Sequence, residues 1–324
     1  MAQFYPDGMV HEENYAETMN NVVVPEMNSI RQDRMVPGKN GNQLFVSVFP
    51  APQPKATVII VHGFTENVDK YLEVIYALNK AGYTVAMHDA RGHGRSYRSP
   101  GLETTADTYV EHFDDYIEDL EILLKTVYKD LPHPWYLLCH SMGGAVGALF
   151  LEKHQDVFDK AVLTSPMIAP FTGMPVWAAQ GLASTMRALG KGKKRIMMSK
   201  GYQGHEDFDT SCATSRPRFD WYDDLKYREP AFQNSSATYG WVAESVAVTK
   251  RILKAGAVEK ITTPSLVLQA SLDTTVCNGP MDEFAKRLKN GKKIIIEGAR
   301  HEIFRSIDKD ACKWMDSILA FYAT

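Results

Sequence analysis

The chain has 324 residues, of which 44% are hydrophobic, and 36 Lys and Arg residues against 39 Asp and Glu residues give a net charge of −3. This slightly acidic balance excludes the broad basic surface that general nucleic-acid binding requires. The hydrophobic content suffices for a large buried core and excludes a disordered chain. No stretch approaches the ~20 apolar residues of a membrane-spanning helix.

Four cysteines are widely spaced and include no C-x-x-C pair, namely Cys139, Cys212, Cys277 and Cys312. We therefore expect free thiols in a reducing compartment rather than a disulfide framework or a zinc site. The N-terminal segment lacks the basic region and apolar run of a signal peptide. These features predict a cytoplasmic protein that needs neither a metal nor a cofactor.

From about residue 43 onward, short apolar runs rich in β-formers alternate with helical patterns. The runs span residues 44–49, 57–63, 83–89, 135–141, 160–166, 264–270 and 292–298, and helix candidates span residues 69–81, 109–131 and 281–289. Continuously apolar strands are typical of a parallel sheet that is covered on both faces. The alternation predicts a mostly parallel, doubly wound α/β fold.

Two regions depart from this alternation. We expect residues 1–35 to form an N-terminal extension that packs along the outside of the core. Residues 167–238 are irregular and rich in Met, Trp, Arg and Pro. They are too long for a plain connection and predict a small, mostly helical subdomain. The core is then formed by residues 36–166 and 239–324.

The motif VHGFTEN (residues 61–67) follows the second core strand. Its chemical use would be a backbone N–H of Phe64 that acts with the N–H of Met142 to bind an oxyanion. The alternative is a tight glycine turn without a catalytic role. In either case we interpret His62 as a framework residue rather than a base.

The sequence LLCHSMGGAV (residues 137–146) runs from an apolar strand into a helix of small residues. It resembles the G-x-S-x-G turn that exposes a nucleophilic serine, here Ser141. Cys139 stands where the first glycine is usual, whereas Gly143 and Gly144 are present. Taken alone, the motif could also be an ordinary serine in a glycine-rich turn.

Two further side chains follow strands near the end of the chain, Asp273 in ASLDTTV and His301 in EGARHEIF. Each is a weak signal alone, because Asp is a common turn residue and a lone His often caps or faces solvent. Together with Ser141 they appear in the order nucleophile, acid, base, which is the order of α/β-hydrolases. In such a triad the imidazole takes the serine proton and the carboxylate orients the imidazole.

These motifs make the chain similar to the monoacylglycerol lipase and bacterial lysophospholipase branch of the α/β-hydrolases. The resemblance covers roughly residues 40–165 and 240–324 and rests on HGF, DARGHGRS, FDDYIEDL, HSMGG, SLDTTV and GARHEIF. It implies an α/β-hydrolase fold with residues 167–238 as a cap. It also implies that Ser141, Asp273 and His301 are catalytic and that Phe64 and Met142 supply the oxyanion hole. Cys139 departs from the lipases but not from the lysophospholipases of this branch.

The resemblance implies a serine carboxylic-ester hydrolase for single-acyl lipids, and we expect a lysophospholipase that works through an acyl-enzyme on Ser141. Monoacylglycerol lipase and general carboxylesterase remain alternatives, and a peptidase or an acyltransferase would use the same triad. A hypothesis from another class is a non-catalytic ligand-binding homologue. The serine excludes dehalogenases of this fold, because these use an aspartate nucleophile.

The expected cap has an apolar first part, residues 166–185, and a basic part, residues 186–200. This pattern is compatible with peripheral contact at the inner face of the membrane and equally with a solvated helix. The basic part could also favour phosphate-bearing headgroups. Acidic residues at 205–209 weaken the membrane interpretation, and the sequence carries no indication of the oligomeric state.

Overall fold

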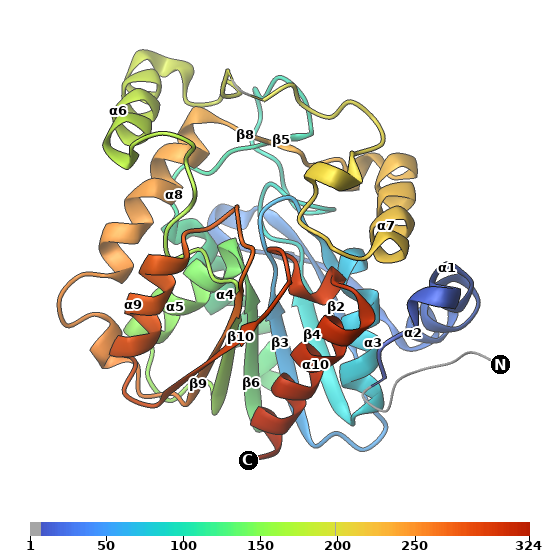
Figure 1. Cartoon of the computed structure of the whole chain (residues 1–324). Coiled ribbons are helices and arrows are strands. Elements are labelled where there is room, and N and C mark those ends of the chain that lie inside the picture. Colours follow the sequence, from blue (N-terminus) through green and yellow to red (C-terminus); the bar gives the residue numbers. More distant parts are fainter. Residues whose placement is uncertain (1–7, 198) are drawn as a thin grey trace.

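The computed structural model describes residues 8–197 and 199–324, and an eight-stranded sheet forms its centre (Figure 1). In spatial order the strands are β1 (Gln32–Pro37), β2 (Gln43–Phe49), β4 (Tyr83–His88), β3 (Ala56–Val61), β6 (Trp135–His140), β7 (Lys160–Thr164), β9 (Ser265–Ala270) and β10 (Gly291–Ile296). The strands from β4 to β10 are parallel, whereas β2 is antiparallel to both β1 and β4. The mostly parallel sheet that the sequence predicts is confirmed.

The helices lie on both faces of the sheet and in a group beyond one of its ends (Figure 1). The longer ones are α3 (Leu72–Lys80), α4 (Asp114–Thr126), α5 (Met142–Lys153), α6 (Val176–Met186), α7 (Arg216–Arg228), α8 (Tyr239–Ile252), α9 (Asn278–Arg287) and α10 (Asp308–Ala323). Short ones are α1 (Tyr15–Thr18), α2 (Val24–Ile30), η1 (Glu12–Asn14), η2 (Met19–Val23), η3 (Lys39–Gly41), η4 (Val68–Tyr71), η5 (Tyr128–Asp130), η6 (Arg187–Lys191), η7 (Phe208–Thr210), η8 (Pro230–Phe232), η9 (Val258–Lys260) and η10 (Ile303–Arg305).

Two apolar layers cover the sheet because successive strand residues point to opposite faces. In β3, Ile59 and Val61 belong to the layer that includes side chains of α4, α5, α8 and α9. Val58 and Ile60 belong to the layer that includes α3, α10 and the N-terminal helices. Each such fully buried side chain contributes about 1.5–3 kcal/mol of hydrophobic stabilisation. This double burial explains the uninterrupted apolar runs.

Two elements differ from the sequence-based expectation. β1 begins at Gln32, within the segment expected to be an extension, and most of its side chains are exposed. An exposed edge strand lacks the apolar run that marks a buried one. Helix α4 begins at Asp114 rather than 109. It is preceded by strand β5 (Asp107–Thr108), which pairs in parallel with β8 (Ser236–Ala237).

Between β7 and β8 the chain forms α6, η6, η7, α7 and η8, which lie beyond one end of the central sheet (Figure 1). Helix α6 packs against α8, and Ala183, Tyr239 and Ala243 form a small apolar cluster there. Helix α7 begins after Ser215, whose hydroxyl accepts a hydrogen bond from Arg218 N. In the described residues between β7 and β8, the regular secondary structure thus consists of helices.

The N-terminal helices lie outside the sheet, beside α3 and α7 (Figure 1). A fully buried arginine, Arg218 of α7, joins them to the core. Its guanidinium donates to Val10 O (2.7 Å), to Glu73 Oε1 of α3 (3.0 Å) and to Asp308 Oδ1 of α10 (2.9 Å). Tyr15 OH donates to Glu73 Oε2 (2.9 Å). One charged residue therefore holds the N-terminal segment, α7 and two core helices together.

Candidate active site

Ser141 occupies a sharp turn between β6 and α5. Its backbone angles are φ 51° and ψ −118°, a conformation that non-glycine residues rarely adopt. The turn is possible because the helix lies close to the neighbouring strands. A Cβ atom at Gly143 would lie 2.1 Å from Val61 O, and one at Gly144 would lie 2.5 Å from Pro166 Cβ. Glycine is therefore required at both positions.

Cys139 precedes this turn and is fully buried. Its sulfur faces Gly147 of α5, where an added Cβ would lie only 2.5 Å from Sγ. Because Gly147 has no side chain, the side chain of Cys139 fits between β6 and α5. Burial raises the pKa of the Cys139 thiol, which keeps it protonated and unreactive.

Ser141, His301 and Asp273 lie in one hydrogen-bonded line. His301 Nε2 is 2.8 Å from Ser141 Oγ, and His301 Nδ1 is 2.7 Å from Asp273 Oδ2. Ser141 follows β6, Asp273 follows β9 and His301 follows β10, and these parallel strands all end at the same edge of the sheet. The ligand-binding crevice of such sheets lies outside that edge. All three side chains are buried.

Asp273 is held in its ionised form. Burial by itself would raise the pKa of this carboxyl group, but the hydrogen bond and charge interaction with His301 outweigh burial and lower the pKa below its ordinary value. Its other oxygen accepts hydrogen bonds from Thr275 N (2.9 Å) and Val276 N (3.0 Å). An ionised carboxylate in this position can orient the imidazole and stabilise an imidazolium.

The two residues expected to supply oxyanion donors flank the serine. Met142 is the first residue of α5, where backbone N–H groups point out of the helix end. Phe64 follows β3, and its ring packs on that of Trp241 at a centroid distance of 4.1 Å. The loop approaches Ser141 closely, because a Cβ at the adjoining Gly63 would lie 2.9 Å from Ser141 Cβ. The geometry is compatible with an oxyanion between the two N–H groups.

A buried charge network lies next to the proposed triad and cannot be recognised from the sequence. Glu66 Oε2 accepts hydrogen bonds from Gly63 N (2.6 Å) and Tyr71 OH (2.7 Å) and lies 3.2 Å from His140 Nδ1. His140 Nε2 in turn lies 3.2 Å from His301 O. Burial opposes ionisation of Glu66, but nearby Lys70 and His140 hold its pKa well below its ordinary value. The carboxylate thus links the Phe64 loop to the backbone of His301.

The other histidines near the site have framework roles. His62 Nε2 accepts a hydrogen bond from Ala90 N (2.8 Å), and burial lowers the pKa of His62. His93 Nδ1 lies 3.0 Å from Arg91 O, and Arg91 forms a bidentate pair with Asp119. In the described residues no group of three or more His, Cys, Asp or Glu side chains could hold a metal ion, and none of their helices is long and apolar enough to cross a membrane.

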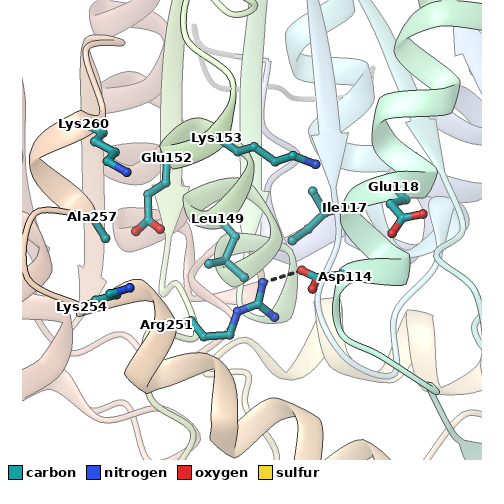
Figure 2. A pocket seen from close by; sticks show the side chains of 10 residues that line it. All are labelled: Asp114, Ile117, Glu118, Leu149, Glu152, Lys153, Arg251, Lys254, Ala257 and Lys260. Carbon is teal, nitrogen blue, oxygen red and sulfur yellow. Dashed lines mark hydrogen bonds and ion pairs between the residues drawn. The ribbon is translucent and has the colours of Figure 1, made fainter.

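Another pocket lies away from the triad, among α4, α5 and residues 251–260 (Figure 2). Its lining is mainly charged, and Arg251 forms an ion pair with Asp114 there. Figure 2 draws no hydrogen bond or ion pair from Glu152 to the other labelled residues, and Glu152 Oε1 is buried without a hydrogen-bond partner among the described residues. Burial raises the pKa of Glu152 to about 7.

Comparison with known proteins places these features in context. Residues 52–308 match the family described as "Serine aminopeptidase, S33". Lysophospholipase L2 of Escherichia coli (strain K12) is 32% identical over 279 residues, which cover 82% of this chain and 79% of that protein. Monoglyceride lipase of Rattus norvegicus is 28% identical over 236 residues, which cover 72% and 71%.

The same lipase type recurs among solved structures. A soluble variant of monoglyceride lipase from Saccharomyces cerevisiae, in complex with a substrate analog, aligns with a TM-score of 0.71. It is 18% identical and covers 90% of this chain and 95% of that one, so the likeness concerns the fold alone. Together with the sheet topology, it confirms the α/β-hydrolase fold that the motifs imply.

Proposed function

This chain belongs to the serine aminopeptidase S33 family of hydrolases, and we propose that it is a serine carboxylic-ester hydrolase for single-acyl lipids, foremost a lysophospholipase. One observation carries the proposal, the hydrogen-bonded line Asp273–His301–Ser141 with distances of 2.7 and 2.8 Å. Such a line activates a serine hydroxyl for attack on a carbonyl carbon.

The proposed reaction has two steps. Ser141 Oγ attacks the ester carbonyl while His301 Nε2 takes its proton, and the N–H groups of Phe64 and Met142 stabilise the oxyanion. His301 then protonates the leaving alcohol, which leaves an acyl-enzyme on Ser141. A water molecule, deprotonated by His301, then attacks this ester, and His301 returns the proton to Ser141 Oγ as the fatty acid leaves.

The relatives support a lipid ester as the substrate. Proteins named lysophospholipase L2 and monoglyceride lipase both match most of the chain, although the family description names an aminopeptidase. The relative at 32% identity favours the lysophospholipase. Monoacylglycerol lipase remains the second candidate, because its relatives match over a similar share of the chain.

We further propose residues 167–238 as the cap over a core of residues 36–166 and 239–324, with residues 1–35 as the extension.

The surface of this proposed cap suits contact with a lipid bilayer. Phe171, Trp177 and Met197 are 63%, 79% and 90% exposed, and lysines stand nearby in sequence. Exposed aromatic and apolar side chains beside cations are typical of surfaces that contact anionic lipid. This favours peripheral contact of a cytoplasmic protein with the inner face of the membrane.

A hydrolysis panel tests the function. Purified protein is incubated with lysophosphatidylethanolamine, lysophosphatidylcholine, monoacylglycerol and p-nitrophenyl butyrate, and Ser141→Ala serves as the matched control. We expect fatty-acid release from the lysophospholipids by the wild type alone. Absence of hydrolysis of every ester, together with no labelling by a fluorophosphonate probe, would support a non-catalytic binding protein instead.

A further inference from the structure

A polar cavity of about 400 Å³ lies beside the proposed catalytic residues. Its lining includes Thr65, which follows Phe64 in the chain, and Glu302, which follows His301. The opposite wall comes from residues 201–212 and from α7. The cavity therefore lies between residues of the cap region and the loops that carry Phe64 and His301, although Ser141, Asp273 and His301 are not part of its lining.

Three buried cations line this cavity, namely Lys70, Lys226 and Arg305, whose side chains are 4%, 4% and 9% exposed. Two carboxylates oppose them, the buried Glu66 and Glu302, whose side chain is 12% exposed. Glu302 lies 2.6 Å from both Lys70 Nζ and Arg305 Nη1, and Glu66 lies 3.2 Å from Lys70 Nζ. The lining as a whole carries three cations and three carboxylates, because Glu206 and Asp207 join Glu302 there. The cations are more deeply buried than Glu206, which is 43% exposed.

Lys226 is the buried cation of this cavity whose carboxylate partner is exposed. Its ammonium forms one ion pair among the described residues, with Glu206 at 2.6 Å, and Glu206 itself is 43% exposed. Burial lowers the pKa of Lys226 even though Glu206 acts in the opposite direction. An ammonium group has three donors, so Lys226 keeps hydrogen-bonding capacity for a ligand.

Further donors at the cavity lack acceptors. Tyr202 OH and Arg305 Nε are buried, and neither has a hydrogen-bond partner among the described residues. Both residues line the cavity, and Lys226 Nζ lies 5.7 Å from the centre of the Tyr202 ring. A buried donor without a partner costs free energy that an acceptor-rich ligand can recover. Phosphate oxygens are acceptors, whereas glycerol hydroxyls must both donate and accept.

The basic segment of the cap is less suited to this role. Arg195 forms a bidentate pair with Asp107, Lys194 forms an ion pair with Glu103, and Lys193 Nζ donates to Pro100 O. These cations already have partners and do not line the cavity. By contrast, Glu206 and Asp207 are exposed parts of the cavity lining, whereas the cations Lys70, Lys226 and Arg305 are buried.

We propose that this cavity binds the zwitterionic phosphodiester headgroup of a lysophospholipid, with the phosphate at Lys226, Arg305 and Tyr202 and the ammonium group near Glu206 and Asp207. The inference rests on the proposed function and specifies its substrate. In a lysophospholipid the phosphate is closer to the scissile ester than the ammonium is. That order matches the buried cations and the exposed carboxylates.

The test compares Lys226→Met with wild type on lysophosphatidylethanolamine and on monoacylglycerol of the same acyl chain. The readout is the ratio of the two kcat/KM values. Loss of a charge-assisted hydrogen bond to phosphate should lower this ratio on the order of 10-fold to 100-fold. Arg228→Met is the matched control, because Arg228 is an exposed cation on the same helix and does not line the cavity. It should leave the ratio within about twofold.

An unchanged ratio in Lys226→Met, or a wild type that hydrolyses monoacylglycerol but no lysophospholipid, would overturn the headgroup assignment. If Lys226→Met does not fold, Tyr202→Phe removes a single hydroxyl group and should lower the same ratio. A wild type that hydrolyses neither lipid contradicts the proposed function rather than the cavity assignment.

A binding experiment tests the cavity without catalysis. Calorimetric titration of Ser141→Ala with glycerophosphoethanolamine should show binding, and the Ser141→Ala, Lys226→Met protein should bind at least 10-fold more weakly, on the order of one lost charged contact. Inorganic phosphate is titrated in parallel. Tighter binding of inorganic phosphate than of the phosphodiester would identify a free-phosphate site and overturn the proposal.

Discussion

Cys139 and Gly147 share one side-chain space between strand β6 and helix α5. The Cys139 sulfur lies where a side chain at position 147 would project, and a Cβ there would approach it to 2.5 Å. In the usual nucleophile turn the glycine is on the strand side, two residues before the serine. Here the strand carries the larger residue and the helix carries the glycine.

This relationship predicts a compensating pair of substitutions. Gly147→Ala alone should lower the free energy of unfolding by about 1–3 kcal/mol through overpacking. In a Cys139→Gly background the side-chain atom nearest to a Cβ at position 147 is Leu137 Cδ2, at 3.5 Å. The double variant Cys139→Gly, Gly147→Ala should therefore be more stable than Gly147→Ala in urea denaturation. Equal stability of the two would contradict the shared space.

Ser141→Ala should abolish ester hydrolysis without unfolding the protein. Loss of a triad member lowers turnover on the order of 10⁴-fold to 10⁶-fold in serine hydrolases. Activity is measured with p-nitrophenyl butyrate, and circular dichroism checks the fold. A variant that retained a tenth of the wild-type turnover would show that Ser141 is not the nucleophile.

Asp273 and His301 should act as one unit with Ser141. Asp273→Asn removes the acceptor that orients the imidazole, and we expect kcat to fall on the order of 10³-fold to 10⁴-fold. The double variant with His301→Ala should be little slower than the slower single variant, since each change disables the same step. Multiplicative losses in kcat would indicate independent roles.

Glu152 makes stability depend on pH. Its pKa is about 7 in the folded protein, above the ordinary value of 4.5, because burial disfavours its charge. Between these two values the folded state retains a proton that the unfolded state has lost, so the contribution of Glu152 to stability falls as pH rises from about 4.5 to about 7. Glu152→Gln should therefore raise Tm more at pH 8 than at pH 5.

Glu118→Gln is the control for this measurement. Glu118 lines the same pocket (Figure 2), but its side chain is 42% exposed and pairs with Lys39. Comparison of the two variants shows how much of the change in Tm is specific to Glu152. A Glu152→Gln effect that is equal at both pH values would show that this carboxyl group is ionised throughout.

Arg218 should be costly to remove by itself. Arg218→Met leaves Glu73, whose side chain is 5% exposed, without its cationic partner, and breaking a buried pair in this way costs about 3–5 kcal/mol. Adding Glu73→Gln should restore part of the loss, because it removes the uncompensated charge. Urea denaturation of both variants measures this. A double variant less stable than Arg218→Met would contradict the pairing.

The sequence predicts the parts of the structure that depend on local patterns. Strands such as β3 and β6 are buried on both faces, so their apolar runs are visible without knowledge of their neighbours. The order Ser141, Asp273, His301 is also readable, because the residues follow strand ends. By contrast, β1 carries exposed polar side chains and shows no such run.

Long-range charge pairing was not predictable from the sequence. Glu66 in the motif VHGFTEN looks like a solvent-exposed turn residue, yet its partner His140 is 74 positions away in the chain. The same holds for Lys226, whose burial depends on how α7 packs against the core. A basic run such as residues 186–200 is easier to notice than a single buried lysine, which is why phosphate recognition is expected there from the sequence.

The position of Arg218 has a consequence for biosynthesis. On the ribosome, Val10 and Glu73 emerge before Arg218, but Ser306 and Asp308 follow it by 88 and 90 residues, and the arginine donates hydrogen bonds to all four. Helix α7 thus reaches its final hydrogen-bonding state only after Ser306 and Asp308 have left the exit tunnel. His301 emerges shortly before them. The nascent chain consequently acquires the proposed catalytic base and the last contacts of α7 at nearly the same moment.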